Sequence, residues 1–126
     1  MIRGIGMDVV EIQRFEEALE RHGERLRNRL FTRAEQEYCD AHPNPGTSYA
    51  ARFAAKEAVA KALGTGIAGG IQWIDIEVVR DSAGRPSIIL HRRARVVFAE
   101  LRGQRVWLSM THSRLVAAAN AVIEGT

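Results

Sequence analysis

Residues 2–10 alternate with a period of two, which is the pattern of a β-strand. One face of this strand is apolar, and the other carries a carboxylate between positions that lack side chains. The apolar face holds Ile5, Met7 and Val9, and the opposite face holds Gly4, Gly6 and Asp8. The strand therefore presents Asp8 on an otherwise bare surface.

Four segments predict helices from their apolar spacing, alanine content and end signals. They are residues 11–30 with a possible break at Gly23, a short segment that Thr32 caps and that runs to about Asp40, residues 48–63, and residues 92–102. Glu35 stands three residues after Thr32 and closes a capping box. Gly64 is placed to end the third helix.

Further strands are expected at residues 72–79, 87–91, 105–111 and 115–123, joined in two hairpins that turn at 81–86 and 112–114. Residues 42–46 are expected to form a loop, because two prolines and a glycine disfavour both helix and strand, and residues 64–70 form a glycine-rich loop. Helices cluster early and strands cluster late. The expected class is therefore α+β, with a largely antiparallel sheet packed against helices.

The chain length of 126 residues predicts one domain over residues 1–126. The longest apolar run is about five residues, against the roughly 20 that cross a bilayer, so no membrane association through a helix is expected. Asp8 and Glu11 occupy the place where a signal peptide would be apolar, which favours a cytoplasmic location. Cys39 is the only cysteine and is expected to be a packing residue.

The charge balance is basic, with 18 Lys and Arg against 15 Asp and Glu. A net charge of +3 is consistent with a polyanionic partner, whether nucleic acid, phosphate or an acidic protein. The chain has only two lysines, and both lie in the predicted helix 48–63, at Lys56 and Lys61. This helix is therefore the first candidate to carry catalytic residues.

Glu57 is an unusual residue for its position on that helix. It follows Phe53 by four residues and precedes Ala60 by three, so its carboxylate lies near the apolar stripe. A half-buried acid needs a partner. Either it pairs with Lys61, one turn later, or it joins Asp8 in a site for a hard cation such as Mg²⁺, which proteins hold through one or two carboxylates.

Arginines form a stripe on the predicted helix 11–30. On a helical wheel Arg14, Arg21 and Arg25 lie within about 20° of a common direction. The glutamates of the same helix lie on a different side. The stripe is either a solvated face or a docking surface for something acidic, because guanidinium groups offer forked donors to carboxylates and phosphates.

Other catalytic motifs are missing or weak. Neither Gly4-x-Gly6 nor the 64–70 loop fits a dinucleotide fingerprint or a P-loop. No Gly-x-Ser-x-Gly elbow surrounds Ser48, Ser109 or Ser113, which argues against a serine nucleophile. His112 lies at the turn of the last predicted hairpin, where a histidine is more often structural than functional.

Taken together, the chain resembles the holo-[acyl-carrier-protein] synthases, the small bacterial type of 4′-phosphopantetheinyl transferase. The resemblance covers nearly the whole chain. It rests on Gly4-Ile5-Gly6-Met7-Asp8-Val9-Val10, Phe31-Thr32-Arg33-Ala34-Glu35 with Tyr38-Cys39, the run from Arg52 to Gly66, and Ser109-Met110-Thr111-His112-Ser113. The run that begins Arg52-Phe53-Ala54-Ala55-Lys56-Glu57 is the most specific of these motifs.

The resemblance implies transfer of the phosphopantetheine arm of coenzyme A to a serine of apo acyl carrier protein, with release of adenosine 3′,5′-bisphosphate. It implies Mg²⁺, with Mn²⁺ as an alternative, and a homotrimer whose active sites lie at subunit boundaries. Asp8 and Glu57 correspond to the metal ligands and Lys61 to the residue that contacts the pyrophosphate. The coenzyme pocket corresponds to Arg52, Lys61, Ser109 and His112, and the carrier-protein surface to Arg14, Arg21 and Arg25.

This chemistry suits the residues present, because phosphoryl transfer depends on positioning and charge neutralisation. Glu57, directly or through a metal-bound water, is the candidate base for the serine hydroxyl, and Lys61 offsets charge on the leaving phosphate. Two alternatives belong to other classes. A small basic nucleic-acid-binding module would need stacking aromatics among its basic residues, yet the chain is only 6% aromatic. A non-catalytic trimeric scaffold leaves Asp8 and Glu57 unexplained.

Overall fold

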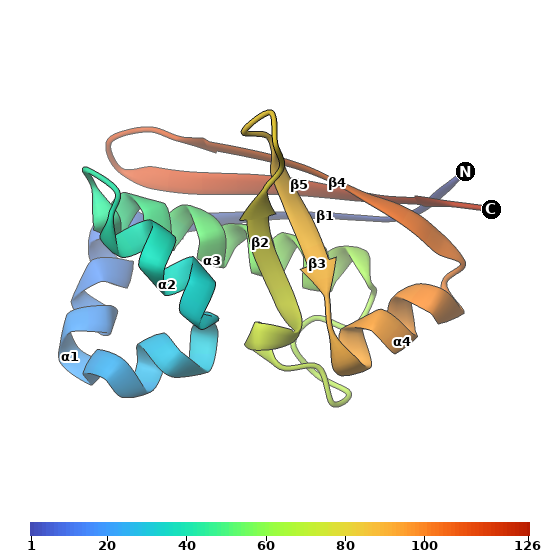
Figure 1. Cartoon of the computed structure of the whole chain (residues 1–126), viewed down its shortest axis with the longest axis horizontal. Coiled ribbons are helices and arrows are strands. Elements are labelled where there is room, and N and C mark those ends of the chain that lie inside the picture. The colour runs from blue at the N-terminus through green and yellow to red at the C-terminus, as the bar shows by residue number, and fades with distance from the viewer.

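The computed structural model describes all residues from 1 to 126 and contains four α-helices and five strands (Figure 1). In chain order these are β1 (Ile2–Glu11), α1 (Ile12–Leu30), α2 (Arg33–Asp40), α3 (Pro45–Ala62), a 3₁₀ helix (Trp73–Asp75), β2 (Ile76–Arg80), β3 (Pro86–Leu90), α4 (Arg92–Glu100), β4 (Gly103–His112) and β5 (Val116–Gly125). The expected α+β class is confirmed. No helix is long and apolar enough to cross a bilayer.

The strands form two antiparallel sheets. The larger has the order β1-β5-β4, and the smaller is the hairpin of β2 and β3. In Figure 1, α3 runs along one face of the larger sheet, and the small hairpin crosses that sheet steeply. The helices α1 and α2 lie at one end of the molecule, and α4 lies at the other. The termini meet in space, since the amide of Gly125 donates to the carbonyl of Met1.

Helix α3 is the centre of the packing, and its small side chains allow other elements to approach it. Ala54, Ala58 and Ala60 are fully buried. One apolar core lies between α3, the larger sheet, α4 and β2, and a second lies between α1, α2 and the first half of α3. Both cores therefore depend on this one helix.

Strand β1 contacts α3 through its glycine face. A Cβ on Gly6 would overlap the carbonyl oxygen of Ala58, and a Cβ on Gly4 would overlap that of Ala62. Only glycine permits so close an approach of two backbones. As a result the face that carries Asp8 is the one that meets α3.

The apolar face of β1 points away from the core. Ile5, Met7 and Val9 are each more than half exposed. Their cross-strand neighbours extend this outer face, because Met7 lies opposite Asn120 and Ile5 lies opposite Val122, itself paired with Trp107 of β4. The larger sheet thus has one face packed on α3 and one uncovered apolar face.

Several predicted boundaries differ from the structure. Pro45 and Gly46 belong to α3 rather than to a 42–46 loop, because a proline fits the first turn of a helix, where its missing N–H is not needed. The expected strand 72–79 begins as a 3₁₀ turn, and only Ile76–Arg80 is extended. Helix α4 ends at Glu100, since Arg102 adopts a positive φ of 61°.

Three local predictions are confirmed. Gly23 breaks α1, with φ 60° and ψ −145° in the middle of the helix. Thr32 and Glu35 form the capping box of α2: the Thr32 hydroxyl accepts from the Glu35 amide, and the Glu35 carboxylate accepts from the Thr32 amide. Cys39 is fully buried, as expected for a packing residue.

Candidate active site

Asp8 and Glu57 lie in the same cavity, which has a volume of about 400 Å³. Asp8 comes from the glycine face of β1 and Glu57 from the middle of α3. The close contact of these two elements at Gly6 and Ala58 brings the acids together, although 49 positions separate them in the sequence (57 − 8). Phe15 and Phe53 supply apolar walls, and Glu11 and Arg14 lie at the same cavity.

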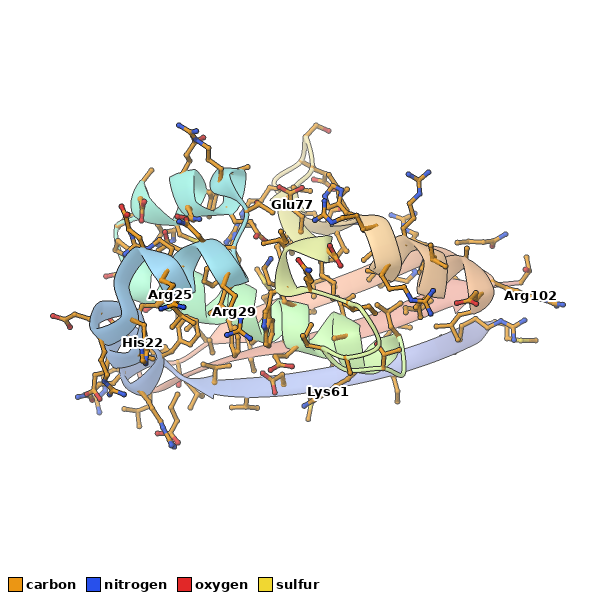
Figure 2. The ribbon with its side chains drawn as sticks, turned by 90° about the horizontal axis from the view of Figure 1, so that it is seen from below. His22, Arg25, Arg29, Lys61, Glu77 and Arg102 are labelled. Atoms are coloured by element: carbon orange, nitrogen blue, oxygen red, sulfur yellow. The ribbon has the colours of Figure 1, made fainter.

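Lys61 contacts Asp8 rather than Glu57. Its Nζ lies 3.2 Å from Oδ1 of Asp8 and donates to the carbonyl oxygen of Met7 at 3.0 Å. No ion pair joins Glu57 to Lys61, so the intrahelical pair considered above does not form. Figure 2 shows Lys61 beside β1, and its side chain is half exposed, which leaves the ammonium accessible from solvent.

The electrostatics of the cavity favour a cation. Burial raises the pKa of the Glu57 carboxyl, the negative charge of Asp8 raises it further, and the charge of Lys61 opposes them. The chain gathers no group of three or more potential metal-binding side chains anywhere. Mg²⁺ is usually bound by one or two protein carboxylates, with waters and substrate phosphates as its other ligands. A site with two carboxylates therefore suits Mg²⁺ better than an ion that takes all its ligands from the protein.

Lys56, the other lysine of α3, lies outside this cavity and is fully buried. Its Nζ is 2.6 Å from Oε1 of Glu35 and donates to the carbonyl oxygens of Trp73 and Ile76. Glu35 also accepts from the amide of Val78. The sequence did not predict this pair. Its contacts connect α2 and the start of β2 to α3, the helix that carries Glu57.

A second cavity, of about 230 Å³, holds Arg52 and His112 together with Thr111. Arg52 is only 2% exposed, and its guanidinium carbon lies 3.9 Å from the ring centroid of Tyr38. Arg80 also lines this cavity. The cavity shares no residue with the one that contains Asp8 and Glu57, because five residues along a helix turn Arg52 about 140° away from Glu57.

Ser109 lies apart from both cavities within one chain. It is exposed on β4 and pairs across the sheet with Asn120, which in turn pairs with Met7. It therefore belongs to the uncovered outer face. The structure brings Arg52 and His112 together but does not bring Ser109 to them.

The three arginines of the predicted stripe are all exposed, and Arg14 also lines the cavity of Asp8 and Glu57. The break at Gly23 separates Arg25 from Arg14 and Arg21, so one helical wheel cannot describe all three. In Figure 2, Arg25 lies with Arg29 on the segment after the break, whereas His22 precedes it.

The sequence profile of the 4′-phosphopantetheinyl transferase superfamily matches residues 4–119. The chain belongs to this superfamily. The match spans every residue discussed above as a candidate metal, coenzyme or docking residue.

Known relatives of this transferase share its full length. The holo-[acyl-carrier-protein] synthase of Koribacter versatilis is 44% identical over 124 residues, covering 98% of this chain and 99% of the relative. The crystal structure of the Neisseria meningitidis synthase superposes with a TM-score of 0.90 at 34% identity, covering 98% and 99% of the two chains. A Bacillus anthracis synthase crystallised with coenzyme A (3′,5′-ADP) gives 0.80 at 35% identity, covering 100% and 99%.

The resemblance to holo-[acyl-carrier-protein] synthases is thereby confirmed for the family and the fold. Membership of a transferase superfamily decides against the nucleic-acid-binding module and the non-catalytic scaffold. The roles of individual residues rest on the geometry described above.

Proposed function

We propose that this transferase moves the 4′-phosphopantetheine group of coenzyme A to a serine of apo acyl carrier protein and depends on Mg²⁺. The observation that carries the proposal is the meeting of Asp8 and Glu57 at one cavity, with Lys61 paired to Asp8, in a chain of this superfamily. Related synthases crystallised with coenzyme A support the coenzyme as co-substrate.

Asp8 and Glu57 are the residues that would hold the divalent ion. The negative charge of Asp8 is the second cause, after burial, of the raised pKa of the Glu57 carboxyl. A cation between the two carboxylates would relieve this repulsion. A bound Mg²⁺ or Mn²⁺ supplies charge neutralisation at the pyrophosphate and makes the phosphorus more electrophilic. Oxygen ligands of this kind accept either ion.

Glu57 is the candidate base. The serine oxygen of the carrier protein forms a bond to the phosphorus that bears pantetheine, its proton passes to the Glu57 carboxylate, and the bond from that phosphorus to the bridging oxygen breaks. The leaving group is adenosine 3′,5′-bisphosphate.

Lys61 completes the set as the residue that offsets charge on the leaving phosphate. Its ammonium is held by Asp8 and the Met7 carbonyl, and a lysine has three donors, so one remains for a phosphate oxygen. The half-exposed side chain permits this approach.

The coenzyme pocket is assigned to Arg52, Lys61, Ser109 and His112, in a homotrimer whose sites lie between subunits. Two observations support this arrangement. Asp8, the partner of Lys61, and Arg52 line different cavities of one chain, so a second chain is needed for Lys61 and Arg52 to meet one coenzyme. The uncovered apolar face of β1 offers a surface for that chain, and soluble proteins rarely leave such a patch open.

The carrier protein is proposed to dock on Arg14, Arg21 and Arg25. Arg14 connects this surface to the reaction, because it lines the cavity of Asp8 and Glu57. A carrier protein bound there would present its serine beside both carboxylates. A single domain over residues 1–126 and a cytoplasmic location belong to the same proposal, supported by the helix shared between both cores and by the free Cys39.

Mass spectrometry tests the reaction directly. Purified apo carrier protein is incubated with coenzyme A, Mg²⁺ and this polypeptide, and a mass gain of one phosphopantetheine group is expected. Chelation of the metal should abolish the gain, and Mn²⁺ should restore it. No gain with several carrier proteins would contradict the proposal.

Subunit mixing tests the shared site. Glu57→Gln chains should be inactive, and Arg52→Ala chains should turn over poorly at a coenzyme A concentration below their raised KM. Refolding the two together should recover part of the activity at that concentration, because some boundaries then combine two intact halves. Sedimentation should give three times the monomer mass. Inactive mixtures of well-folded trimers would place all the residues of one site within one chain.

A further inference from the structure

Arg52 is a buried cation without a matching anion. No carboxylate lies within ion-pair distance of its guanidinium, and Nε has no hydrogen-bond partner. Its one side-chain hydrogen bond, from Nη1 to the Ser48 hydroxyl, is long at 3.5 Å. Burying a charge in this state is costly unless the site serves a ligand of opposite charge.

The Tyr38 ring is the main support of this cation. The guanidinium carbon of Arg52 lies 3.9 Å from the ring centroid, which is the geometry of a cation–π contact. Such a contact fixes the plane of the guanidinium and leaves its net charge in place. A carboxylate partner would instead neutralise the charge and occupy the donors.

Arg80 also contacts the Tyr38 side chain. Its Nε donates to the Tyr38 hydroxyl at 2.8 Å, and its Nη1 donates to the carbonyl of Gly84 at 2.8 Å. Its guanidinium carbon lies 5.4 Å from the same ring. The hairpin of β2 and β3 is thus connected through Tyr38 on α2 to Arg52 on α3.

We propose that Tyr38 and Arg80 are positioning residues that keep the Arg52 guanidinium oriented and uncompensated for a phosphate group of coenzyme A. This inference rests on the proposed function, in which Arg52 belongs to the coenzyme pocket. A guanidinium held flat presents its donors as a fork, which suits phosphate oxygens. The two residues act on coenzyme binding and have no part in the proton transfer at Glu57.

Steady-state kinetics with coenzyme A and carrier protein test the inference. Tyr38→Leu removes the ring and should raise the KM for coenzyme A roughly tenfold, the effect of losing one desolvated cation–π contact. Its kcat and its KM for carrier protein should stay within about twofold, because the substitution weakens binding of the coenzyme equally in the ground state and in the transition state. A merely structural defect would instead lower kcat or raise both KM values.

A double-mutant cycle tests the hydrogen bond. Tyr38→Phe keeps the ring and loses the hydroxyl, while Arg80→Lys keeps the charge and loses the Nε donor. Each should raise the KM for coenzyme A by a similar, smaller factor, and the double variant should be no worse than either, because both remove the same bond. Both sites are exposed, so these variants keep the test valid should Tyr38→Leu fail to fold.

Arg52→Lys separates this inference from the proposed function. In that background Tyr38→Leu should have no further effect on coenzyme binding. An unchanged KM in Arg52→Lys and Arg52→Ala overturns the assignment of Arg52 to the coenzyme pocket. A raised KM in the Arg52 variants with normal values in the Tyr38 and Arg80 variants overturns only the positioning role. Arg33→Gln, on the same helix as Tyr38 but paired only with Glu37, is the matched control.

Discussion

The ammonium of Lys61 lies 3.2 Å from Oδ1 of Asp8, a residue 53 positions earlier in the chain, and not beside Glu57, one helical turn away. This relationship leaves Glu57 without a cationic partner of its own. Asp8 and Glu57 therefore line one cavity, and the single lysine nearby pairs with Asp8. The unpaired carboxyl, that of Glu57, is the one whose pKa is raised by burial and by the charge of Asp8.

Loss of either acid should abolish transfer. Asp8→Asn and Glu57→Gln are expected to lower kcat about 100-fold or more, because each removes a group that neutralises developing charge or accepts the proton. Asp8→Asn should also raise the Mg²⁺ concentration needed for half-maximal rate. Glu11→Gln, at the rim of the same cavity, is the control and should stay within about twofold. Near-normal turnover of Asp8→Asn at ordinary magnesium would remove the metal assignment.

Glu57→Gln should stabilise the metal-free protein while inactivating it. An acid whose pKa is higher in the folded state than in the unfolded chain reduces stability as pH rises through the folded pKa. The variant should therefore melt a few degrees higher than the parent at pH 8 with chelator, and this gap should shrink toward pH 5. Calorimetry at one fixed protein concentration measures it. Added Mg²⁺ should raise the melting temperature of the parent chain more than that of the variant.

Gly6→Ala should separate β1 from α3. The added methyl overlaps the Ala58 carbonyl oxygen, and a backbone atom cannot rotate away, so the free energy of unfolding should fall by about 1–3 kcal/mol. Urea titration measures the loss. Because Asp8 lies two residues further on the same face, the Mg²⁺ requirement should also rise. An unchanged unfolding midpoint would mean that strand and helix are less closely packed than described.

Breaking the buried pair of Lys56 and Glu35 should destabilise the fold. Lys56→Met leaves the Glu35 charge buried and should lower the free energy of unfolding by roughly 3–5 kcal/mol. Adding Glu35→Gln removes that stranded charge while keeping an acceptor for the Val78 amide, so part of the loss should be recovered. A double variant less stable than Lys56→Met would contradict this account.

Charge reversal on α1 should weaken carrier-protein binding. Arg14→Glu and Arg21→Glu are each expected to raise the KM for carrier protein about tenfold at low salt, with a smaller effect at high salt, and to leave the KM for coenzyme A unchanged. Arg102→Glu, at the opposite end of the molecule from α1 in Figure 2, is the matched control. A selective rise in the coenzyme KM would show that the docking surface is misplaced. Arg25→Glu tests whether that surface continues past the break at Gly23.

Local sequence patterns determined much of this structure. The capping box at Thr32 and Glu35, the break at Gly23 and the end of α3 before Gly64 follow from contacts within a few residues, which the chain makes almost regardless of its surroundings. The motif that contains Glu57 was specific enough to indicate the family.

Only the tertiary structure decided what each face meets. Periodicity showed that Asp8 shares a face with Gly4 and Gly6, but not that this bare face, rather than the apolar one, is buried. Of two lysines five residues apart, one reaches a distant strand and the other enters the core. These outcomes depend on how closely two backbones approach and on partners about 20 to 50 positions away in the chain. Spacing along one helix or strand carries no information about either.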